Sequence, residues 1–247
     1  MKIKKRDIYT SIMLLFLFTS GFSSNVIANE YQNGIKINDE LIWNCQLCDD
    51  NKMDALFGEF WNEAGIFENL SANSRMKWSV NMVEENSTTL SALINTWTWM
   101  SEDNWGTHDN SSKFSYLKNP SLYPSGFNFT DILPFIPFWL PVPVGEYLGE
   151  ISLGDIYDVD NRVLPTLNVQ INKDSIHPNE PTETVYIIAI YNSNGILSSF
   201  KLYTSGNVVV VDISLESLQF IVIFSTVGLV LAFLCSIVLY IKKKRIN

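Results

Sequence analysis

The sequence VYIIAIYNSNGILSSFKLY, at residues 185–203, carries the clearest hairpin pattern in the chain. Residues 185–191 are apolar on both faces, as in a buried strand, and residues 196–203 alternate apolar and polar side chains. Asn194-Gly195 lies between them, and this dipeptide favours the tight turns that join antiparallel strands. The stretch therefore predicts a β-hairpin within an antiparallel sheet.

Other segments extend this sheet in both directions. Apolar and polar residues alternate strictly over residues 75–82, and similar patterns predict strands at 89–100, 113–117, 162–171 and 207–213. Residues 49–62 begin with polar capping residues and then show helical spacing of Met53, Leu56, Phe57, Phe60 and Trp61. The predicted fold class is α+β: a mostly antiparallel sheet of about seven strands, curved or half-barrel in form, with one N-terminal amphipathic helix. A closed barrel or a sandwich is the alternative.

The sheet pattern ends just before a long uncharged segment. Residues 217–241 contain no charged side chain, and Lys242, Lys243, Lys244 and Arg245 follow at once. At about 1.5 Å per residue, a helix from Leu218 to Ile241 measures about 36 Å, enough to cross a hydrocarbon core of about 30 Å. We therefore predict a C-terminal transmembrane helix at 217–241 and a basic tail at 242–247.

The N-terminus has the layout of a secretory signal peptide. Four basic residues lie within residues 1–7, the apolar run IMLLFLF covers 12–18, and Val26-Ile27-Ala28 supplies small residues for cleavage after Ala28. An uncleaved second span is the alternative, but the apolar run is short for a span and is broken by residues 19–21. We expect a mature chain whose residues 29–216 form one domain.

Charge predicts how the chain is oriented. Residues 29–217 hold nine Lys or Arg and twenty-five Asp or Glu, a net charge of −16, whereas both ends of the chain are basic. Basic segments stay on the cytoplasmic side, so we expect a type I protein of the cell membrane with its acidic domain outside and its tail in the cytoplasm. An acidic surface repels phosphate backbones, which argues against a nucleic-acid partner.

Cys45 and Cys48 form a CxxC motif just before the predicted helix. Outside the cell this pair is expected to be oxidised, and a structural disulfide is the interpretation we favour. A CxxC at a helix N-terminus also resembles the thioredoxin motif, and Leu164-Pro165-Thr166 resembles the Pro-Thr pair of that family, which would imply redox catalysis. A zinc site is disfavoured, because the two histidines are isolated and a second CxxC is missing.

Further site candidates rest on residue type alone. The acidic segment DIYDVDN offers oxygen ligands for calcium, although its spacing differs from an EF-hand loop; the candidates are Asp155, Asp158, Asp160 and Asn161. Sequons for N-glycosylation place acceptors at Asn69, Asn86, Asn110 and Asn128. Because motifs for nucleophilic, phosphate or zincin chemistry are missing, we predict no catalytic residue and no cofactor, while paired carboxylates for glycoside hydrolysis stay open.

Residues 132–144, ILPFIPFWLPVPV, combine four prolines with large apolar side chains. Prolines so placed exclude a helix and an internal strand, so we predict an extended loop. It could fold over an open face of the sheet as a lid that completes the core. Alternatively it could contact the membrane or an acyl ligand, with contacts through Phe135, Phe138, Trp139 and Leu140.

Small residues recur every four positions in the predicted span, at Gly228, Ala232 and Ser236. Such a stripe lets two helices approach closely, so we expect weak homodimerisation through it; a monomeric anchor is the alternative.

The order of signal peptide, WNCQLC segment, aromatic strands, Pro-Phe-Trp run, YNSNGILSSFKLY and C-terminal span resembles uncharacterised archaeal surface proteins of the Asgard type. The resemblance implies a cell-surface protein and assigns no activity. We predict a single-pass surface protein whose domain binds an extracellular protein, glycan or lipid and is not an enzyme. The alternatives are a thiol-disulfide oxidoreductase that uses Cys45 and Cys48, and a lipid-handling domain with residues 132–144 as its lid.

Overall fold

The computed structural model describes residues 31–63, 65–101, 104–126, 136–173 and 181–216. The predicted signal peptide, transmembrane helix and basic tail lie outside these residues. Within the described ranges, no helix is both long and apolar enough to cross a membrane.

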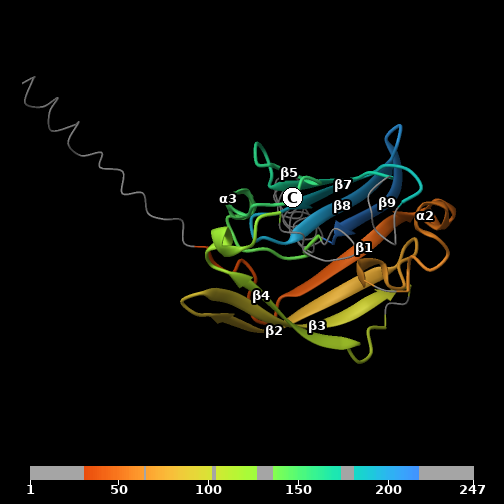
Figure 1. The fold of residues 1–247 in the computed structure, drawn as a ribbon. Helices are drawn as coiled ribbons and strands as arrows, with labels where there is room; N and C mark the ends of the chain where they lie inside the picture. Colours follow the sequence, from red (N-terminus) through yellow and green to blue (C-terminus); the bar gives the residue numbers. More distant parts are fainter. Residues whose placement is uncertain (1–30, 64, 102–103, 127–135, 174–180, 217–247) are drawn as a thin grey trace, which may run out of the picture. The chain divides into compact units, whose positions relative to one another are not determined.

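Nine antiparallel strands form a single open sheet in the order β4-β3-β2-β1-β9-β8-β7-β6-β5 (Figure 1). This confirms the mostly antiparallel fold. The strands are β1 Glu40–Cys48, β2 Arg75–Glu85, β3 Thr89–Met100, β4 Asn110–Leu117, β5 Tyr157–Asp160, β6 Thr166–Ile171, β7 Val185–Tyr191, β8 Leu197–Thr204 and β9 Val208–Leu215.

The hairpin of β7 and β8 forms as predicted, with Ile188 opposite Lys201 and Ala189 opposite Phe200. Gly195 in its turn has a φ of 75°, a left-handed conformation that glycine adopts without strain. The same glycine lies against the backbone carbonyl of Leu140, where a Cβ atom would collide. The turn therefore needs glycine both for its backbone conformation and for close packing.

Two strands were not predicted from the sequence. β1 was missed because its alternation of buried and exposed residues is interrupted by a bulge between Cys45 and Leu47. β5 is four residues long and carries two aspartates, so its sequence, YDVD, was considered only as part of the acidic segment DIYDVDN. Cross-strand pairing fixes both segments as strands.

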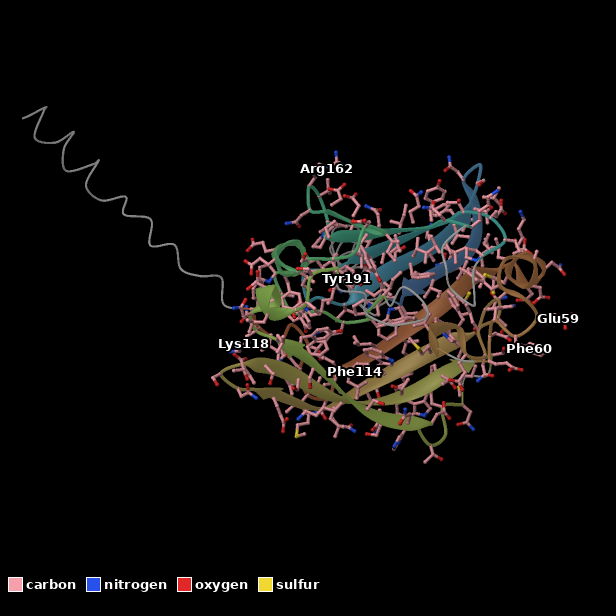
Figure 2. All side chains as sticks on the ribbon, viewed as in Figure 1. Glu59, Phe60, Phe114, Lys118, Arg162 and Tyr191 are labelled. Atoms are coloured by element: carbon pink, nitrogen blue, oxygen red, sulfur yellow. The ribbon has the colours of Figure 1, made fainter. Side chains whose placement is uncertain are left out.

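The predicted helix at 49–62 is shorter than expected. α2 covers Asp50–Phe57, and Asp49 caps it by accepting a hydrogen bond from the Lys52 backbone N–H at 3.1 Å. The helix ends at Gly58, whose φ is 89°. Phe60 was predicted to lie on the buried face of this helix, but it follows the helix end and is 72% exposed (Figure 2).

Three shorter helices complete the described chain: the 3-10 turns η1 Gly65–Phe67 and η2 Pro120–Leu122, and the α-helix α3 Val144–Glu150. α3 was not predicted from the sequence, and it begins at Val144, the last residue of the proline-rich segment 132–144.

The sheet is curved around residues 136–140. The buried hydroxyl of Tyr116 in β4 donates to the Trp139 carbonyl at 2.8 Å, and that of Tyr191 in β7 donates to the Pro137 carbonyl at 2.9 Å. These two strands are six positions apart in the sheet, about 29 Å if it were flat at about 4.8 Å per strand. Because carbonyls only two residues apart reach both strands, the sheet must bend strongly toward this segment.

Candidate functional site

Residues 136–144 lie on the inner face of the sheet and are held there by backbone hydrogen bonds. Leu140 N–H donates to Gly195 at 2.8 Å, and Leu197 N–H donates to Phe138 at 2.9 Å. Further along, Gln32 and Val142 form an antiparallel bridge. The predicted extended loop thus has extended backbone, with isolated antiparallel bridges at Trp139 and Val142.

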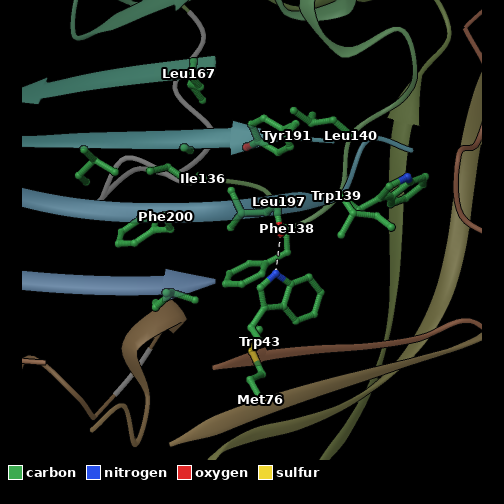
Figure 3. Close-up of a cluster of buried hydrophobic side chains, with 14 of the residues drawn as sticks. Trp43, Met76, Ile136, Phe138, Trp139, Leu140, Leu167, Tyr191, Leu197 and Phe200 are labelled. Carbon is green, nitrogen blue, oxygen red and sulfur yellow. Dashed lines mark hydrogen bonds between the residues drawn. The ribbon is translucent and has the colours of Figure 1, made fainter. Parts of the chain in front are cut away.

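The side chains of this segment enter the core. Phe138 is 5% exposed, and its ring lies edge-on to Trp43, with 4.9 Å between centroids, and 5.6 Å from Trp78 (Figure 3). Trp139 is buried edge-on to Tyr116 at 5.1 Å, and Leu140 is fully buried. These three residues complete the core, as a lid would, and do not present a surface to lipid. Phe135 lies outside the described residues.

The bulge in β1 brings Cys45 and Cys48 onto the same face. In a regular strand, residues three apart point to opposite faces. Here Cys45 and Cys48 are both buried, while Gln46 and Leu47 between them are exposed. Both cysteines are free thiols in this structure, so the disulfide stays a prediction.

The surroundings of Cys48 disfavour its thiolate form. Hydrogen bonding with Cys45, burial and the nearby Asp50 carboxylate raise the pKa of the Cys48 thiol well above its usual value. The Cys48 Sγ atom lies 3.5 Å from the Asp50 carboxylate, at the start of α2. A reactive thiol needs a lowered pKa, so this environment suits a structural cysteine better than a catalytic one.

Three of the four calcium candidates contact other residues. Arg162 forms an ion pair with Asp160 at 2.6 Å, and its hydrogen bonds lower the pKa of Asp160 to about 2. Asp158 accepts a hydrogen bond from Asn168 at 3.4 Å, Asn161 lies against Gly145, and Asp155 is exposed. Across the described part of the chain, no group of three or more His, Cys, Asp or Glu side chains could hold a metal ion.

Three of the predicted glycosylation acceptors lie in the described residues, and all three are exposed. Asn69 follows η1, Asn86 lies in the turn between β2 and β3, and Asn110 begins the edge strand β4. The side-chain oxygen of Asn86 accepts hydrogen bonds from the Thr88 backbone at 2.8 Å and from the Thr88 hydroxyl at 3.1 Å. Asn128 and the stripe of Gly228, Ala232 and Ser236 lie outside the described residues.

An aromatic and cationic group on the outer face was not predicted. It consists of Arg75, Lys77, Trp97 and Trp105, and we call it the outer Trp cluster. Lys77 lies 5.0 Å from the centre of the Trp97 ring, and Arg75 lies 5.5 Å from that of Trp105. Lys77 in β2 lies opposite Trp97 in β3. The cluster therefore becomes apparent only when the register between these two strands is known.

A shallow groove of about 450 Å³ lies between α2 and residues 182–183. Thr182 closes one side of it, since its N–H donates to the Leu56 carbonyl at 3.0 Å and its hydroxyl to the Ala55 carbonyl at 2.7 Å. Its lining mixes Asp49, Lys52 and Glu183 with Leu56, and it contains no arrangement typical of a catalytic site.

Comparison of the chain with protein-family models, with curated proteins and with solved structures gave no match.

Proposed function

We propose that this chain is a single-pass, type I protein of the cell membrane that displays the nine-stranded domain outside the cell as a binding module. The observation that carries the proposal is the end of β9. This strand stops at Leu215, and Glu216 is still bound to the sheet through its backbone N–H, which donates to Ile42 at 2.7 Å. The predicted span starts at the next residue, so the sheet itself connects to the anchor.

Binding is proposed on the outside of the domain, because its own segment 136–144 occupies the inner face of the sheet. The turn between β5 and β6 presents two apolar side chains, Val163 at 91% and Leu164 at 51% exposure. We take these two adjacent exposed apolar side chains as the contact for another molecule. An extracellular protein is the partner class that two exposed aliphatic side chains suit.

The two alternatives have less support. A lipid-handling domain would need an acyl chain on the inner face, where Phe138, Trp139 and Leu140 are packed. A thiol-disulfide oxidoreductase would need an activated thiolate, whereas the pKa of Cys48 is raised. The proximity of Cys45 and Cys48 instead favours a disulfide within the end of β1, across the bulge that brings the two thiols onto the same face.

Protease treatment of intact cells tests the orientation of the full chain carrying an epitope after Asn247. We expect the protease to remove the domain and to leave a small membrane fragment that keeps the epitope. A variant with Lys242–Arg245 replaced by serines provides the control, since its orientation should become mixed. A protected domain together with a digested epitope would show the opposite orientation and would overturn the proposal.

A further inference from the structure

The outer Trp cluster combines two amphipathic rings with two covered cations. Arg75 forms two hydrogen bonds with Glu216, both at 2.8 Å, and Lys77 forms an ion pair with Glu40 at 2.6 Å. The Arg75 and Lys77 side chains are only 26% and 12% exposed. The cluster is therefore locally neutral, and an indole ring lies over each of its cations.

The partner of Arg75 is also the residue next to the predicted span. Glu216 is fixed to the sheet, and the apolar segment begins with Ser217 and Leu218. Two residues of chain span at most about 7 Å. The headgroup layer is about 5–7 Å deep on each side of the hydrocarbon core. If Leu218 lies at the hydrocarbon boundary, Glu216 and the Arg75 guanidinium must lie within the headgroup layer or at its edge.

The chemistry of the cluster matches that layer. Trp side chains are favoured at membrane interfaces because the ring is apolar and its N–H can hydrogen-bond, and Arg and Lys extend to the same depth. Trp97 and Trp105 lie with their ring centres 6.5 Å apart and are both partly exposed, and Trp97 lies on the strand face that also carries Arg75. The surface beside the anchor is thus suited to lipid headgroups.

We propose that the outer Trp cluster rests in the headgroup layer of the membrane and holds the domain against the lipid surface. This inference rests on the proposed function, since it needs the anchor that begins after Glu216. Because the cations are already paired, the contact depends on the indole rings, and zwitterionic lipid is sufficient for it.

Quenching of tryptophan fluorescence by brominated lipid tests the contact in the full chain. All seven tryptophans lie between residues 43 and 139, so the predicted span adds no signal. In phosphatidylcholine vesicles with bromine near the headgroup end of the acyl chains, we expect part of the emission to be quenched. The W97F/W105F variant should lose most of that quenched part. W61F is the matched control, because Trp61 is also partly exposed but lies outside the cluster.

Two results would overturn the inference while leaving the proposed function intact: quenching that W97F/W105F leaves unchanged, or quenching that W61F removes instead. If the double variant does not fold, the single variants W97F and W105F should each lose a share of the quenched emission, and unchanged quenching in both would be equally decisive. Alkaline carbonate extraction tells whether the proposed function fails as well. Release of the full chain from the membrane would overturn both proposals, whereas a chain that stays in the membrane leaves the proposed function intact.

Discussion

Truncation of Phe138 measures how far the inner segment stabilises the domain. Phe138→Ala removes a ring that is 95% covered and lies against both Trp43 and Trp78. Comparable truncations of buried Phe cost about 3–5 kcal/mol, and each aromatic pair accounts for about 0.5–1.5 kcal/mol of such a loss. Domains are stable by only about 5–15 kcal/mol, so this single change should remove a large share of the total.

The assay is thermal unfolding of the full chain in lipid vesicles, followed by tryptophan emission. At about 2–4 °C per kcal/mol for a domain of this size, the melting temperature should fall by about 6–20 °C. Phe60→Ala makes the same chemical change at a side chain that is 72% exposed, and it should shift the free energy of unfolding by less than about 0.5 kcal/mol. Equal effects of the two variants would show that Phe138 does not complete the core.

Gly195→Ala should destabilise the domain by at least about 1 kcal/mol more than Gly206→Ala in the same unfolding assay. Both glycines have a left-handed φ, but only at Gly195 would the new Cβ meet the Leu140 carbonyl; equal losses would contradict this reading. Arg162→Ala should raise the pKa of Asp160 from about 2 to near its ordinary 3.8, as followed by NMR titration. Since the folded pKa is the lower one, the ion pair stabilises the fold above pH 4, and its effect is lost as the pH falls toward 2; an unchanged pKa would assign the shift to another group.

Local pattern was sufficient for most of the sheet. The hairpin at 185–203 and the alternation that begins at Arg75 formed as predicted, because strand formation there follows from side chains a few residues apart. The pattern failed at β1, where a bulge reverses the alternation after Cys45. It also failed after Phe57, since the helical spacing of Phe60 and Trp61 continues past a glycine whose backbone ends the helix.

The candidate site depended on contacts that no local pattern contains. Apolar character alone suggested Phe138 and Trp139 as surface contacts, yet both side chains are buried by strands far from them in the sequence. Conversely, the sequence around Trp97 predicts a strand but does not indicate a contact with Lys77. That contact depends on the register between β2 and β3.

The sequence alone specifies the order of charge and hydropathy along the chain, and from it come the predictions of signal peptide, acidic domain, span and basic tail. These predictions need no contact between distant residues, because transfer into a membrane depends on composition over about twenty consecutive positions. Tertiary structure assigned the aromatic residues to the two faces of the sheet. Which rings are buried depends on strand order, curvature and register, and these arise from the packing of segments more than a hundred residues apart, such as Trp43 against Leu197.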